Sequence, residues 1–106
     1  EATGEKLALA HDFDGRIAVM FGTHTHVQTA DAQILPNKTA YITDAGMTGV
    51  IHSVLGVSIK NSTDRIRTGL PIRFEQCEGD CRLEGVLIET DNKTGKAVNI
   101  ERVSLT

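Results

Sequence analysis

The chain has 106 residues, of which 40% are hydrophobic, 24% charged and 4% aromatic, and its formal net charge is −3. This size fits a single domain over residues 1–106, with a modest core of aliphatic side chains. The acidic balance and the lack of a Lys/Arg stripe argue against duplex nucleic acid as a partner. No apolar run approaches the ~18 residues of a membrane span, and no signal-peptide pattern is present, so we expect a cytoplasmic protein without membrane association.

The first predicted element is a short helix over residues 2–12. Thr3 can cap it, Leu7 and Ala10 lie on one face, and Gly15 provides a stop signal. Residues 16–21 then form a continuous apolar run that ends at Gly22, which predicts a strand buried on both faces.

The remainder of the chain is predicted to be mostly β. A polar connection over 28–38 with a turn at Pro36 precedes a short strand over 39–43 and a glycine-punctuated loop over 44–49. Apolar residues at period two over 66–74 predict a long strand with Pro71 at an edge or bend. Residues 82–89 and 96–105 predict a hairpin around 91–95, with a bulge between Ile100 and Val103. The fold class is α+β, with a mainly antiparallel sheet and one or two short helices.

Two cysteines, Cys77 and Cys81, flank a short polar turn. Two ligands at this spacing make a poor structural zinc site, which normally has four. A disulfide would not persist in a reducing cytoplasm. We therefore expect free cysteines with no special chemistry.

The segment Gly22-Thr23-His24-Thr25-His26 carries the clearest chemical signal. Along an extended backbone, residues i and i+2 point to the same side, so both imidazoles would project together beyond the end of a buried strand. They could then bind one metal ion or two neighbouring ions. The competing interpretation is two solvent-facing histidines in a polar loop.

A metal centre needs more ligands than this pair. A catalytic zinc needs about three protein ligands, and a two-metal site needs more, including a bridging carboxylate. Asp31 and Asp44 are candidate contributors, although turn formation and capping are the commoner roles of such residues. His11 and His52 are interpreted as surface histidines.

Several blocks of the sequence carry a family resemblance, and the Gly-Thr-His-Thr-His block is the most specific of them. The blocks are residues 22–31, 34–37, 39–44, 46–49, 69–75, 94–97 and 100–103. Together they resemble the bacterial YmdB-like family of calcineurin-type metallophosphoesterases, and the resemblance covers essentially the whole chain.

The resemblance implies a four-layer α/β/β/α sandwich with a two-metal centre that hydrolyses phosphodiesters, including cyclic nucleotides. By position, His24 would bind one ion and His26 the other, with Fe, Mn or Zn as the metal pair. Thr25 and Thr48 would contribute to substrate binding. No residue of this chain is assigned as a catalytic acid or base.

The same resemblance places the family's other metal ligands and its catalytic His upstream of Glu1. We therefore expect a C-terminal segment of a larger metallophosphoesterase domain. Its partner would be the missing N-terminal half or another copy of the chain, and alone it would be inactive and bind metal weakly or not at all. Two alternatives stay open: a non-catalytic β-rich interaction module with an incidental His pair, and a mononuclear hydrolase that borrows ligands from a second copy.

Overall fold

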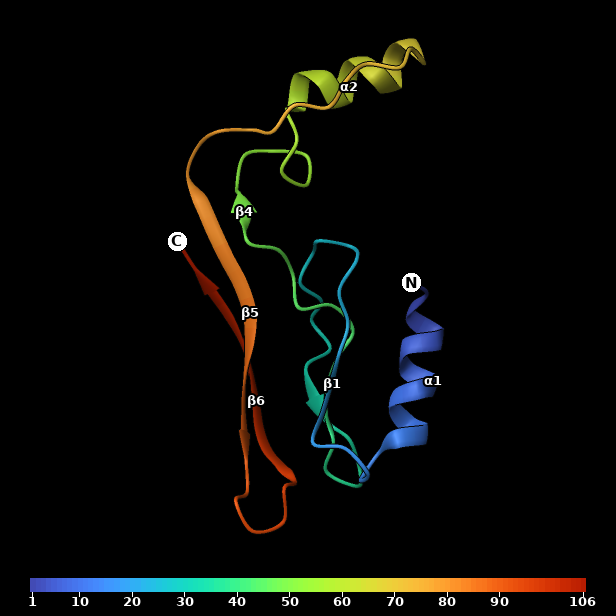
Figure 1. The fold of residues 1–106 in the computed structure, drawn as a ribbon, viewed down its shortest axis with the longest axis vertical. Helices are drawn as coiled ribbons and strands as arrows, with labels where there is room; N and C mark the ends of the chain where they lie inside the picture. Colours follow the sequence, from blue (N-terminus) through green and yellow to red (C-terminus); the bar gives the residue numbers. More distant parts are fainter.

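The computed structural model describes all 106 residues as an elongated molecule with principal extents of 54 × 29 × 17 Å. Helix α1 lies on one side of a small sheet, and a long β-hairpin lies on the other side (Figure 1). A second helix projects from one end of this body (Figure 1). The elements are α1 (Thr3–Phe13), β1 (Val19–Phe21), β2 (Gln33–Ile34), β3 (Ala40–Ile42), β4 (Gly49–Val50), α2 (Ile59–Thr68), β5 (Cys81–Thr90) and β6 (Ala97–Leu105).

The first sheet has the order β1-β3-β2, with β3 in the centre. Strand β1 runs parallel to β3, and β2 runs antiparallel to it. All three residues of β3 are buried, and Tyr41 packs with Ala10 of α1 and with Leu35 in a small apolar core. Burial of β3 from both sides explains why this short strand is the most enclosed part of the chain.

The second sheet has the order β4-β5-β6 and is antiparallel throughout. Strands β5 and β6 form the long hairpin, which is joined to the first sheet by a hydrogen bond from the Ala97 N–H to the Lys38 carbonyl (2.9 Å). Among the paired strands, only β1 and β3 run parallel to each other. The predicted α+β class, with two helices and mainly antiparallel sheets, is confirmed.

The first helix and the hairpin confirm the sequence-based predictions within two residues at each end. The predicted cap is wrong, because Thr3 is the first helical residue and Ala2 occupies the N-cap position without a side-chain hydrogen bond. At the other end the helix stops at Phe13, and Gly15 follows with φ +87°, a value that glycine adopts without strain.

The predicted strand over 66–74 is wrong. Helix α2 occupies residues 59–68, and an irregular connection follows it. The Ser58 side chain accepts a hydrogen bond from the Asn61 N–H at the start of the helix, and Gly69 ends it with φ +67°. The alternating apolar pattern over 66–74 therefore spans the end of α2. The capping residues Ser58 and Gly69 are the stronger local signal.

Two smaller predictions are also corrected. The strand over 16–21 is limited to 19–21 and is not buried on both faces, since Phe21 is 59% exposed. The bulge lies earlier than predicted: pairing is regular from Leu83 with Leu105 to Glu89 with Asn99, and Thr90 then pairs with Ala97, which leaves Val98 as the extra residue.

Neither helix is long and apolar enough to cross a membrane. Cys77 and Cys81 are both free thiols, as expected.

Strand β1 has only one neighbour, because it lies at the edge of its sheet. An open strand edge next to the exposed Phe21 side chain is a template for pairing with another chain. We propose that the 106-residue chain self-associates through this edge. Replacing Phe21 with Lys, a residue that discourages edge pairing, should shift the protein toward monomer in sedimentation velocity experiments.

Phe74→Lys is the matched control, because Phe74 is similarly exposed (52%) and lies in the connection after α2. A monomeric wild-type chain at high concentration, or an equal effect of both substitutions, would contradict the proposed interface.

Candidate metal-ligand loop

The loop over residues 22–26 begins just after β1, where backbone hydrogen bonds join Gly22 to the chain at the end of β3. The Gly22 N–H donates to the Ile42 carbonyl (3.0 Å), and the Ala45 N–H donates to the Gly22 carbonyl (2.9 Å). A Cβ atom on Gly22 would lie 2.0 Å from the Thr43 carbonyl oxygen. Only glycine fits here, so a steric clash with any side chain explains why the first residue of the motif is glycine.

The two histidines of the motif do not lie on extended backbone. His24 has φ +106° and His26 has φ +64°, in the region that residues other than glycine rarely adopt. The predicted extended geometry, from which a shared side of the imidazoles was inferred, is therefore wrong. Non-glycine residues in such conformations cost about 1–3 kcal/mol each, so the surrounding structure has to hold them in place.

Asp44 provides most of that support, and it lies two residues after the end of β3. Its side chain is fully buried. Oδ2 accepts hydrogen bonds from the Thr25 N–H (2.8 Å) and the Thr25 hydroxyl (2.7 Å), while Oδ1 accepts one from the Gly46 N–H (2.9 Å). The residue between the two histidines is thereby fixed to the end of the central strand.

The environment of Asp44 favours its ionised form. Burial alone would raise the pKa of this carboxyl group. The hydrogen bonds from Gly46 and Thr25, together with the positive charge of Lys6, outweigh burial and hold the pKa below its ordinary value.

Asp31 has a similar role on the return side of the loop. It accepts hydrogen bonds from the Thr29 hydroxyl (2.6 Å) and the Thr43 N–H (3.2 Å), and a short one from the Thr43 hydroxyl. The Thr43 hydroxyl also contacts the Tyr41 hydroxyl in the core (2.9 Å). Both aspartates considered as candidate ligands thus hold loops in place through hydrogen bonds.

The imidazoles themselves face solvent. The side chain of His24 is 60% exposed and its Nε2 lies 3.8 Å from Glu1 Oε1, while His26 is also exposed. No group of three or more His, Cys, Asp or Glu side chains in the chain is arranged to hold a metal ion. Imidazole nitrogen is a ligand type that transition metals accept, but residues 1–106 contain no group of side chains that completes such a site.

The remaining predicted residues lie as follows. Thr25 and Thr48 are exposed, and the Thr25 hydroxyl is engaged by Asp44. His11, in the last turn of α1, and His52, after β4, are both exposed as expected.

Two residues around the loop were not singled out from the sequence. The Gln28 side-chain amide donates to three carbonyls, those of Ala45 (3.3 Å), Gly85 (2.8 Å) and Val103 (3.3 Å), and so joins the loop to β5 and β6. The Lys6 ammonium donates to the carbonyls of Thr23 (2.8 Å) and Thr43 (3.3 Å). Their partners are 17 to 75 residues away, so no local pattern reveals them.

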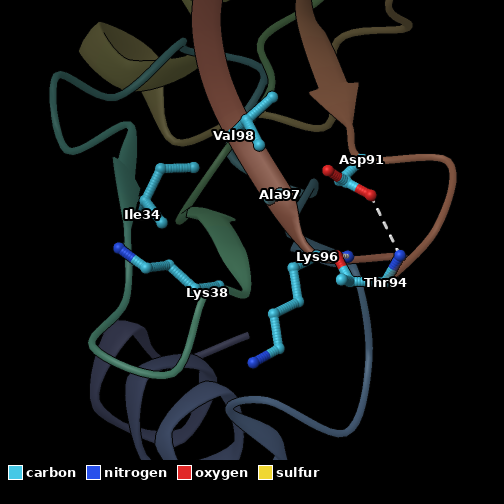
Figure 2. A pocket seen from close by; sticks show the side chains of 7 residues that line it. All are labelled: Ile34, Lys38, Asp91, Thr94, Lys96, Ala97 and Val98. Carbon is cyan, nitrogen blue, oxygen red and sulfur yellow. Dashed lines mark hydrogen bonds between the residues drawn. The ribbon is translucent and has the colours of Figure 1, made fainter.

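The largest cavity, about 380 Å³, lies at the other end of the body. It sits between the turn before β3 and the turn of the β5–β6 hairpin (Figure 2). Asp91 accepts hydrogen bonds from the backbone of Lys93 (2.7 Å) and Thr94 (3.0 Å), so its charge stabilises the turn. The lining residues are Ile34, Lys38, Asp91, Thr94, Lys96, Ala97 and Val98, and none belongs to the histidine loop.

Comparison with known proteins identifies the family. The YmdB-like protein family matches residues 1–103. The chain belongs to the YmdB-like family. It is 54% identical over 103 residues to the 2′,3′-cyclic-nucleotide 2′-phosphodiesterase of Bacillus subtilis, a match that covers 97% of this chain and 39% of that protein. It is 40% identical over 106 residues to a putative phosphatase/phosphodiesterase of Mycoplasma pneumoniae, covering 99% of this chain and 38% of the relative.

Solved structures share the fold of this YmdB-like chain. A hypothetical protein from Thermus thermophilus superposes with a TM-score of 0.92 at 42% identity, covering 99% of this chain and 41% of the other. A novel phosphatase from Mycoplasma pneumoniae gives the same TM-score at 40% identity, covering 99% and 38%. The chain thus spans about two fifths of the length of the curated relatives it matches. The YmdB-like family named from the sequence is confirmed.

The anchoring role of Asp44 predicts a pH-dependent loss of stability. Because its pKa is lowered on folding, its contribution is present above the unfolded value of about 3.9 and disappears as the pH falls through the lower folded value. Asp44→Asn should therefore lower the free energy of unfolding by ~1–3 kcal/mol at pH 7, and the difference from wild type should shrink at pH 3. Urea denaturation at both pH values measures this.

Asp12→Asn is the control, since Asp12 is exposed and makes only a surface ion pair with Arg16. A deficit for Asp44→Asn that does not change between pH 7 and pH 3 would rule out the charged form as the source of the stability.

Proposed function

We propose that this chain forms part of the two-metal centre of a phosphodiesterase, with His24 bound to one divalent ion and His26 to the other. The observation that carries the proposal is the anchored loop: two exposed imidazoles flank Thr25, which Asp44 fixes to the buried end of β3. A pair of ions such as Fe, Mn or Zn would supply charge neutralisation of the phosphate and a water of lowered pKa. The remaining ligands would come from outside residues 1–106, since the chain offers no group of three.

The substrate class follows the named relatives. The Bacillus subtilis relative is a 2′,3′-cyclic-nucleotide 2′-phosphodiesterase, and we propose a phosphodiester substrate, such as a cyclic nucleotide, for the complete enzyme. The Thr48 hydroxyl is exposed, and we propose that it donates to a phosphate oxygen. The Thr25 hydroxyl hydrogen is already directed to Asp44, so Thr25 would act by holding the loop.

Metal binding by the chain alone tests the ligand assignment. Two imidazoles without a bridging carboxylate should bind Zn²⁺ or Mn²⁺ weakly, and less well in acid, because protons compete with the metal for the ligand nitrogens. Calorimetric titration of the His24→Ala/His26→Ala double variant should show this binding lost. The control is His11→Ala/His52→Ala, which removes two exposed histidines away from the loop and should leave the affinity unchanged.

Equal binding by both double variants would remove His24 and His26 from the site and favour a non-catalytic module.

Catalysis is tested by transplanting the chain into a full-length relative. We expect no hydrolysis of 2′,3′-cyclic AMP by the 106-residue chain, even with Mn²⁺, because it lacks the acidic ligands that hold two ions together. A chimera in which this chain replaces the matching 39% of the Bacillus subtilis relative should be active. In the chimera, His24→Ala or His26→Ala should lower kcat by orders of magnitude, whereas His52→Ala should not.

Robust metal-dependent turnover by the isolated chain would contradict this division of ligands. It would favour a hydrolase that completes its site with a second copy of the chain.

A further inference from the structure

Lys6 occupies an unusual place for a lysine. It is the fourth residue of α1, near the helix N-terminus, where the helix dipole disfavours a cation. The side chain is partly buried and extends from the helix to the first sheet. Helix propensity and solvation would be equally favourable if the Lys6 side chain pointed into water. A tertiary contact therefore explains its position.

That contact lies where β1 and β3 end side by side. The Lys6 ammonium donates to the Thr23 carbonyl (2.8 Å), which follows β1, and to the Thr43 carbonyl (3.3 Å), which follows β3. The methylene stem packs over Gly22, where a Cβ would lie 3.0 Å from the Lys6 Cδ. One side chain therefore fixes the exit of both parallel strands relative to α1.

Lys6 fixes the residue before His24, and Asp44 fixes the residue after it. Lys6 holds the carbonyl of Thr23, and Asp44 holds the N–H and hydroxyl of Thr25. His24 lies between these two fixed residues with φ +106°. The lysine and the aspartate carry opposite charges, so together they fix the loop without adding net charge beside a cation site.

We propose that Lys6 is a positioning residue for His24, paired with Asp44 across the ligand loop. The inference rests on the proposed function for its metal readout, but its structural part, the ordering of residues 23–25, stands independently. Removing the ammonium frees the Thr23 carbonyl, and the loop then samples conformations in which the imidazole is misplaced. Residues that orient metal ligands from behind typically change affinity about 10- to 100-fold when replaced.

The test uses the full 106-residue chain with Lys6→Met, which keeps the stem and removes the donors. We expect Zn²⁺ affinity to fall roughly 10-fold and the Thr25 amide, which donates to Asp44, to exchange its hydrogen faster. Lys6→Arg, which keeps a cationic donor, should recover most of the affinity. Lys60→Met is the matched control, because Lys60 is 82% exposed on α2 and pairs only with Asp64.

The outcomes separate the inference from the function on which it rests. Loss of affinity in Lys6→Met but not in Lys60→Met supports the proposal. Unchanged affinity in Lys6→Met, while His24→Ala/His26→Ala abolishes binding, overturns it. If Zn²⁺ binding does not depend on the histidines at all, the proposed function fails. Hydrogen exchange at the Thr25 amide in Lys6→Met then tests the positioning role. Faster exchange than in the unsubstituted chain supports that role, and unchanged exchange overturns it.

A second measurement covers the case in which Lys6→Met does not fold. In the unsubstituted chain, the Lys6 ammonium should give an NMR signal with slow hydrogen exchange, because it is bonded to two carbonyls, whereas the Lys60 ammonium should exchange fast. Equally fast exchange at both lysines would overturn the proposal.

Discussion

The hydrogen bonds accepted by Asp44 connect the core of this chain to the exposed histidine loop. The carboxylate is fully buried, and a buried charge is tolerated only where donors surround it. Here the donors come from Thr25 in the histidine loop and from Gly46 in the next loop. The shape of both loops is therefore coupled to the ionisation of a single side chain at the end of the central strand.

The conformation of the histidine loop follows from this arrangement. His24 and His26 have positive φ values that isolated peptides rarely adopt, so they depend on contacts made elsewhere. Gly22 allows the close approach of β1 to β3, Asp44 fixes Thr25, and Gln28 joins the loop to the hairpin. Contacts of this kind reduce the ordering that ligand binding to the exposed imidazoles would require.

The histidine loop and the largest cavity lie in different parts of the molecule. The histidine loop lies near the N-terminus of α1, close to Glu1, whereas the largest cavity lies beside the turn at Lys38 and the tip of the hairpin. Helix α2 projects beyond the body at the end away from the hairpin turn (Figure 1). The high structural similarity to a Mycoplasma pneumoniae phosphatase, at 40% identity, indicates that this elongated arrangement belongs to the fold and not to one sequence.

Elements with local signals can be predicted from the amino-acid sequence alone. Helix α1 and the β5–β6 hairpin follow from apolar periodicity and turn residues, and the Gly22–His26 block identified the family. Helix α2 was missed, because alternation over 66–74 crossed the helix end at Gly69. Tertiary structure decided the turned backbone of His24 and His26, the burial of Asp44 and the reach of Lys6 and Gln28. These depend on hydrogen bonds between residues 17 to 75 positions apart, and such contacts leave no periodic trace in the chain because each involves a single side chain.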